Sequence, residues 1–297
     1  MGASSTSDIF VPEVAADAII AGISDEGIPV LYGSRAVNVS SDLASQGSLK
    51  VGKLLTVPYF GMIPAWQEDV PEKVGLQPDS ASETTETAAV AQAGVHIEWS
   101  TWQQMIMTAR TRRLDPYMLF AQQARERLVQ MFERKLVKVA RDSLSSDYIH
   151  DVSGSSETIS WDAIADARQK RGDASGKISM MSMHSKVHTD AIKLKDGDDR
   201  PLFIDPYGGE GKIPRFQGIP TFVSDFNYKS SDATAKYDTL LMQDGSIALW
   251  HTMPTVEITR DAKANMSGIA LWIWYVAHRY SKLPGGSKPG VTILRTI

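Results

Sequence analysis

The chain has 297 residues, no cysteine and a formal net charge of −4 at pH 7. The lack of cysteine excludes a disulfide framework, a thiolate metal site and a thiol nucleophile, and the acidic balance disfavours a dedicated nucleic-acid-binding protein. Hydrophobic residues make up 42% and charged residues 22%, which is typical of a soluble globular protein. No apolar run reaches the roughly 18–20 residues of a membrane span, and the first residues have neither the basic nor the apolar region of a secretory signal.

The N-terminal part predicts a short helix followed by an extended arm. Val11-Pro12-Glu13 begins a helical pattern that ends near Ile23, and proline suits the first helical turn because its missing N–H is unpaired there anyway. From Gly27 to Gly47 there is no sustained hydrophobic period, and Gly, Ser and Asn interrupt the stretch.

Two strands joined by a long polar segment come next. Residues 49–63 and 88–99 are rich in β-formers, and Val95, Ile97 and Trp99 alternate with polar positions in the second. The polar segment, 64–87, contains three prolines and many Ser, Thr and Glu residues. Connections longer than about 12–15 residues are uncommon and often functional. The pattern therefore predicts a projecting hairpin with an acidic tip.

The longest predicted helix runs from Pro116 to about Leu144, with Asp115 as its N-cap. Apolar residues recur at three- and four-residue steps and include Leu128, Phe132, Leu136 and Val139, which we expect to face the core. The other side of the helix is basic and includes Arg125, Arg134, Lys138 and Arg141. Such a helix is more than twice the average length, so we expect it to form the axis of its domain.

A mixed region and a β-rich end complete the chain. We expect a helix over 161–169 with Ser160 as its cap, and a hairpin over 239–250 that turns at Asp244-Gly245. The remaining expected elements are a strand at 178–183, a helix at 184–194, an interrupted strand within 213–224, and strands at 255–260, 269–280 and 291–294.

This order of elements resembles the major capsid proteins of tailed phages, which have the Hong Kong ninety-seven-type capsid fold. Pro58 to Trp66 and residues 95–99 are similar to the two arms of the family's E-loop hairpin. Residues 217–225 and 243–246 are similar to its "G-x-P-V" strand and "G-D-x-S" turn, although Gln243 replaces the usual glycine, and Leu271 to Arg279 looks like the closing P-domain strand. No single motif is specific; the resemblance depends on the order and covers about residues 10–297.

The resemblance implies an α+β fold with five parts. These are an N-terminal arm at 1–48, the E-loop hairpin at 49–100, the P-domain spine helix at 101–148, the A-domain at 149–252 and returning P-domain strands at 253–297, of which the last strand could rejoin the A-domain. The implied function is structural, without enzymatic activity or a cofactor: self-assembly into the icosahedral shell around double-stranded phage DNA. The alternative is an encapsulin-like shell protein that encloses a cargo enzyme.

Charge is distributed unevenly between two of these parts. From Glu68 to Glu86 six acids face one lysine, a net charge of −5, and from Arg110 to Arg141 nine basic residues face three acids, a net charge of +6. In the family, the E-loop of one subunit lies over the P-domain of the next, so opposite charges would guide that contact. We expect an assembly interface between two sets: acidic Glu68, Asp69, Glu72, Glu83 and Glu86, and basic Arg125, Arg134, Lys138 and Arg141. Two independently solvated surfaces are the alternative.

Patterns for other chemistry are weak. His184 and His188 have the i, i+4 spacing of a two-histidine metal site, but Ser185 stands where a metalloprotease needs glutamate, and no third ligand is evident. There is no G-x-S-x-G motif and no phosphate-binding loop. Some capsids of this family join an E-loop lysine to a P-domain asparagine. Lys73 and Asn265 are the candidates here, with an ordinary surface lysine and turn asparagine as the alternative.

The expected partners are further copies of the chain, as hexamers and pentamers. Because the arm begins within about ten residues of Met1, we expect no built-in scaffold segment. We therefore expect a separate scaffolding protein, a portal and in some cases a decoration protein. The DNA would be enclosed without sequence-specific binding. The expected location is the virion, with assembly in the host cytoplasm.

Overall fold

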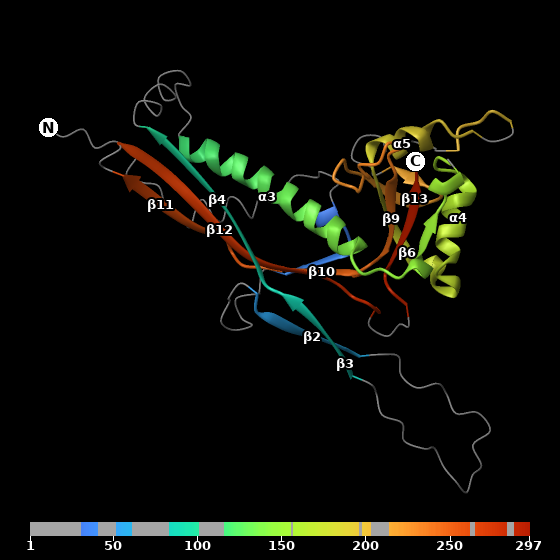
Figure 1. The fold of residues 1–297 in the computed structure, drawn as a ribbon, viewed down its shortest axis with the longest axis horizontal. Coiled ribbons are helices and arrows are strands. Elements are labelled where there is room, and N and C mark those ends of the chain that lie inside the picture. Colours follow the sequence, from blue (N-terminus) through green and yellow to red (C-terminus); the bar gives the residue numbers. More distant parts are fainter. Residues whose placement is uncertain are drawn as a thin grey trace, which may run out of the picture.

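The structure is a computed structural model, and its ribbon shows an elongated molecule with two lobes and a projecting hairpin (Figure 1). It describes residues 31–40, 52–60, 83–100, 116–155, 157–195, 198–202, 214–261, 265–283 and 288–297. Within these ranges, no helix has both the length and the apolar character needed to cross a membrane. The predicted helix at 11–23 lies outside the described residues.

The first lobe is built on a five-stranded sheet around one long strand, β12 (Met266–Arg279). Antiparallel neighbours on β12 are β4 (Ala91–Ser100), β11 (Thr255–Asp261) and β10 (Ile247–His251), and β1 (Val37–Ser40) is parallel to β10. The arm therefore includes a sheet strand, which the unpatterned sequence at 27–47 did not predict.

The predicted spine helix is present as α3 (Pro116–Arg141) and lies along the first sheet (Figure 1). It ends three residues earlier than expected, because Ser143 adopts the left-handed conformation, with φ of 58°, and stops the helix. Phe132 and Leu136 are fully buried, and Leu128 and Val139 pack half-buried against the same cluster. The short 3-10 helix η2 (Leu31–Gly33) closes this core, with Leu31 fully buried.

The second lobe is a six-stranded sheet with two helices. Its strands, in spatial order, are β5 (Ile149–Asp151), β13 (Val291–Thr296), β9 (Tyr237–Gln243), β6 (Ile178–Met183), β8 (Ile219–Val223) and β7 (Arg215–Phe216). Its helices are α4 (Trp161–Gln169) and α5 (Ser185–Ile192), with 3-10 turns at Ser146–Tyr148, Ser153–Ser155 and Gly172–Lys177.

The two lobes share a core through the second sheet. Leu240 and Met242 of β9 pack in one cluster with Phe132 and Leu136 of α3, whereas Leu241 between them packs with α4 and α5. This alternation is the two-residue period of a strand that is covered on both faces. The C-terminal half of α3 thus joins the two sheets.

Two strand boundaries differ from the sequence-based expectation. The descending arm of the hairpin is two strands: β3 (Glu83–Ala89) pairs with β2 (Leu54–Phe60), while β4 pairs with β12. Val90 separates them, since its backbone N–H and C=O bond to Lys53 and Gly52. Glu83 and Glu86 therefore belong to a strand and not to the polar connector. Residues 84–87, Thr-Thr-Glu-Thr, suit a strand because threonine is β-branched.

The predicted hairpin over 239–250 is wrong. Asp244-Gly245 does turn, with φ of 66° at Gly245, but β9 joins the second sheet and β10 the first. β13 likewise joins the second sheet. The expected part at 149–252 therefore includes one strand, β10, that lies in the first sheet, whereas β13 lies in the second sheet, as the expectation allowed for the last strand.

Candidate assembly interface

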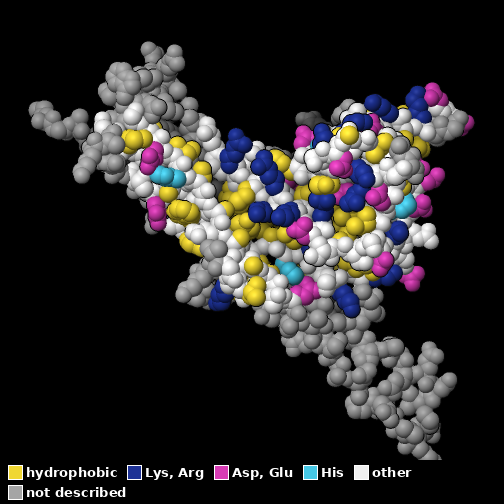
Figure 2. Space-filling model, viewed as in Figure 1, with side chains coloured by type: hydrophobic (Ala, Val, Ile, Leu, Met, Phe, Trp, Pro, Cys, Tyr) yellow, Lys and Arg dark blue, Asp and Glu magenta, His cyan; other side chains and the backbone are white. Residues whose placement is uncertain are grey.

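The outer side of α3 presents exposed basic residues. Arg134, Lys135 and Lys138 are all exposed, and dark blue side chains gather in the centre of Figure 2, where α3 runs. The guanidinium of Arg134 also lies 4.8 Å from the ring centroid of Phe226, in the segment after β8. Two of the four predicted basic residues, Arg134 and Lys138, are thus available to a neighbouring molecule. The side chain of Arg125 lies outside the described residues.

Arg141 does not belong to this exposed basic surface. Its Nε donates to Asp238 Oδ2 at 2.7 Å, and its guanidinium carbon lies 3.3 Å from the ring centroid of Tyr228. Asp238 is fully buried and also accepts from Arg295, at 2.7 and 3.2 Å. These hydrogen bonds raise the pKa of Arg295 above its usual value. A buried carboxylate needs such partners, so Arg141 joins the end of α3 to β9 within the subunit.

Glu86 also has partners inside its own subunit. Its carboxylate contacts His278 Nε2 at 2.5 Å and accepts from the Ser281 backbone N–H at 3.0 Å and from the Ser281 hydroxyl. Burial alone would raise the pKa of Glu86, but the hydrogen bonds from Ser281 and His278 lower it. Its side chain is only 13% exposed. Glu86 therefore fastens the base of the hairpin to the end of β12, and we remove it from the predicted acidic interface.

The other predicted acidic residues stay predictions. Glu68, Asp69 and Glu72 lie outside the described residues. Glu83 is the first residue of β3, and its side chain is not described. The remaining acidic charge is thus predicted for the segment that connects β2 to β3, and these two strands project from the first lobe in Figure 1.

Glu133 is a buried acid on α3 that the charge count treated as a surface residue. It is 1% exposed, and its carboxylate faces the Leu31 and Tyr32 backbone and the Ser224 hydroxyl without closing a well-aligned hydrogen bond to the described residues. Burial raises the pKa of Glu133 to about 7. Near neutral pH this group is only partly ionised, so the basic excess of the helix exceeds the formal count.

The histidine pair does not form a metal site. His184 precedes α5 as its N-cap, and its Nδ1 accepts from the Lys186 N–H at 3.1 Å, whereas His188 is buried within the helix. Among the described residues no group of three or more His, Asp or Glu side chains could hold a metal ion. Asn265, the asparagine of the predicted cross-link, lies in the turn between β11 and β12 with a φ of 51°, which fits its role as a turn residue. Lys73 lies outside the described residues.

Comparisons with known proteins point to the fold. No family model matches the chain, and no curated protein matches it by sequence. Among solved structures, the chain is similar to the capsid of Ralstonia phage GP4, with a TM-score of 0.63 at 11% identity over 90% of each chain. The chain has the Hong Kong ninety-seven-type capsid fold. This capsid fold also matches the capsid asymmetric unit of cyanophage Pam1, with a TM-score of 0.58 at 12% identity over 92% of this chain and 94% of that one. A structure from Mycobacterium phage Che8 matches equally well, at 0.58 and 13% identity over 89% and 90%.

Proposed function

We propose that this chain is a major capsid protein, which self-assembles into the icosahedral head shell enclosing the double-stranded DNA of a tailed phage. The observation that carries this proposal is the likeness to the Ralstonia phage capsid along 90% of both chains. The encapsulin-like alternative is not favoured.

The mechanism follows from the shape of the subunit. The hairpin β2–β3 projects from the first lobe, so it can reach a neighbour in a head-to-tail contact that closes into rings. The acidic residues predicted at its far end, Glu68, Asp69, Glu72 and Glu83, would lie near exposed Arg134 and Lys138 of that neighbour. Individual exposed ion pairs contribute about 0–1 kcal/mol. Repetition around a shell is what makes such contacts effective.

We infer further that the chain assembles with other proteins of the virion. Hexameric and pentameric contacts differ only slightly in angle, and a factor of ten between products corresponds to about 1.4 kcal/mol. A separate scaffolding protein would select one product, a portal would occupy one vertex, and a decoration protein could bind outside. DNA would be enclosed without sequence-specific contacts, and assembly would take place in the host cytoplasm.

Electron microscopy of the purified full chain tests the function. We expect capsomers, tubes or closed shells of mixed size from the chain alone, and shells of one size when the scaffolding protein is co-expressed. A single small uniform shell from the chain alone would favour the encapsulin-like alternative. A monodisperse monomer under all conditions would contradict a shell function.

Deleting the segment that connects β2 to β3 tests the role of the hairpin in assembly. Removing residues 66–82 leaves β2 and β3 joined by the five residues 61–65, a normal length for a hairpin loop. We expect circular dichroism to show a folded subunit, and size-exclusion chromatography to show that this variant forms no shells. Normal particles from this variant would contradict an essential role for the far end of the hairpin.

A further inference from the structure

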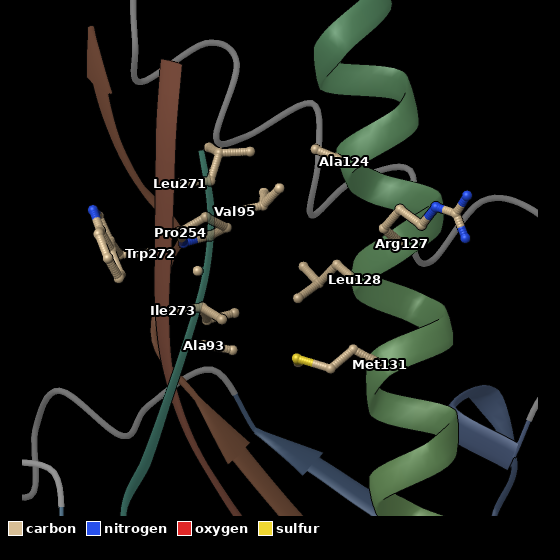
Figure 3. Close-up of a pocket in the computed structure, with 11 residues that line it drawn as sticks. Ala93, Val95, Ala124, Arg127, Leu128, Met131, Pro254, Leu271, Trp272 and Ile273 are labelled. Atoms are coloured by element: carbon tan, nitrogen blue, oxygen red, sulfur yellow. The ribbon is translucent and has the colours of Figure 1, made fainter. Parts of the chain in front are cut away.

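An apolar groove lies between α3 and the first sheet (Figure 3). Leu128 and Met131 point from α3 toward Val95, Leu271 and Ile273 of the sheet, while Trp272 points from the opposite face. The groove encloses a cavity of about 230 Å³. That volume is below the roughly 300–1,000 Å³ of small-molecule sites, so the groove suits a few protein side chains better than a ligand.

Strand β4 leaves two large apolar side chains exposed, one in the groove and one beside it. Val95 and Ile97 are each 39% exposed, and their alternation with buried Trp99 places both on the side of the sheet that faces α3. Large apolar side chains left open in a groove mark a surface that another segment covers. The stripe Ala124, Leu128 and Met131 on α3 forms the facing wall at helical spacing.

The described chain begins beside this groove. Leu31 is fully buried in the core cluster against which Leu128 and Met131 pack, and the Tyr32 ring stacks on Phe132 with centroids 5.6 Å apart. Phe132 follows Met131 directly along α3. Leu31, the first described residue, therefore lies at one end of the groove, which extends about 10 Å along α3 from Met131 to Ala124.

The sequence before Leu31 has the pattern that such a groove accepts. On the predicted helix at 11–23, the residues Val11, Val14, Ala15, Ala18 and Ile19 share one face, and Glu13 and Asp17 lie on the other. Residues 8–26 contain five acids and no basic residue. Arg127, at the rim of the groove with its guanidinium directed away from the sheet, gives this rim the opposite charge.

We propose that residues 11–23 of the same chain dock as an amphipathic helix in the groove between α3 and β4, with Val14 and Ile19 covering Val95. The connecting residues 24–30 can span up to about 24 Å, so the segment reaches the whole groove. Its attachment next to Met131 gives it a high effective concentration over any competing segment. The docking goes beyond the proposed capsid function, because it concerns the subunit itself.

The absence of cysteine from the chain makes a thiol probe specific. Val95→Cys in the full chain provides one thiol on the groove floor, and its reaction rate with a maleimide reports its accessibility. Replacing Val14 and Ile19 with serine should increase this rate about tenfold, because the apolar stripe then no longer stabilises the docked segment. Replacing Ala16 and Ile20, on the opposite helix face, with serine is the matched control and should leave the rate unchanged. Equal rates in all three proteins would overturn the proposal.

A cross-link distinguishes the same chain from a second copy. In the Ile19→Cys, Val95→Cys double variant, a short bismaleimide should give a cross-linked species of monomer mass. Cross-linked dimers, or no cross-link, would overturn the proposal. If deleting residues 66–82 exposes the Val95→Cys thiol instead, the occupant is the hairpin of a neighbouring copy. Leu128→Cys provides a second position on the facing wall if Val95→Cys fails to fold. Both readouts concern the subunit, so failure of shell assembly does not affect them.

Discussion

Glu133 lies on the buried side of α3 because it shares the helical spacing of Leu136, Val137 and Ala140, which are all buried. This spacing was visible in the sequence and would have separated Glu133 from the surface acids. The free-energy cost of burying the Glu133 side chain depends on pH. The folded protein binds the proton more tightly than the unfolded chain, so stability is highest below the usual glutamate pKa of 4.5 and falls as the pH rises through about 7.

Glu133→Gln tests that pH dependence. Glutamine stays neutral, so the variant should have the same free energy of unfolding as the parent protein at about pH 4 and exceed it by about 3 kcal/mol at about pH 8. Urea unfolding at the two pH values measures the difference. Glu126→Gln, at an exposed position of the same helix, is the control. If the difference in free energy of unfolding between variant and parent were the same at both pH values, Glu133 would be ionised in the folded protein at no cost.

Glu86→Gln tests the attachment of the hairpin base. The lowered pKa of Glu86 means that its ionised form stabilises the fold at neutral pH, and that this contribution is lost as the pH falls below about 4.5. We expect the variant to lose about 1 kcal/mol at neutral pH and the difference to shrink in acid. Amide hydrogen exchange in β3 measures this difference in stability. Glu257→Gln, at an exposed position, is the control. Unchanged exchange in β3 at neutral pH would contradict the role of the Glu86–His278 contact.

Among the elements, α3 depends most on one buried face. Leu136→Asp places an unpaired charge in the shared core, at a cost of several kcal/mol, which is comparable to the typical 5–15 kcal/mol total stability of a domain. We expect an insoluble product. Lys135→Asp, one position earlier and exposed, should remain soluble. A soluble, shell-forming Leu136→Asp protein would mean that the burial of this helix face is wrong.

Local signals predicted individual elements well. Ser160 caps α4 as expected, with its hydroxyl accepting from the Ala163 N–H at 3.0 Å, and β6 spans the predicted residues 178–183. Pairing between strands was less predictable. The turn at Asp244-Gly245 is present, but a turn signal fixes only local backbone direction, and β10 finds its partners in β1 and β12, which come from distant parts of the chain.

The candidate interface was predictable in composition but not in detail. Arg134 and Lys138 are exposed, as an amphipathic helix requires. Arg141 and Glu86 are engaged by residues 97 and 192 positions away, Asp238 and His278. No local pattern contains such partners, because they depend on how the two sheets come together.

At the scale of the whole molecule, the charge asymmetry predicts how assembly responds to salt and to charge reversal. The Debye screening length shortens to about 3 Å near 1 M salt. Because the attraction between the acidic and basic segments is then screened, assembly should slow at this salt concentration. Changing Glu68, Asp69 and Glu72 to lysine should slow it further, since repulsion replaces attraction. Light scattering measures the rate. Adding Arg134→Glu and Lys138→Glu to the triple variant should restore part of the assembly rate, because the two segments then again carry opposite charges. Unchanged assembly by the triple variant would refute a role for these charges.

The long strand β12 also determines how the subunit responds to mechanical tension. It pairs with β4 from Met266 to Tyr275, with β11 from Met266 to Trp272 and with β10 from Tyr275 to Arg279. Antiparallel hydrogen bonds run perpendicular to the strands, so a pull along β12 strains many of them in parallel and does not peel them apart one by one. A subunit stretched along this axis, as in a container under internal pressure, would therefore resist extension far better than the two-stranded hairpin, which can be unzipped from its open end.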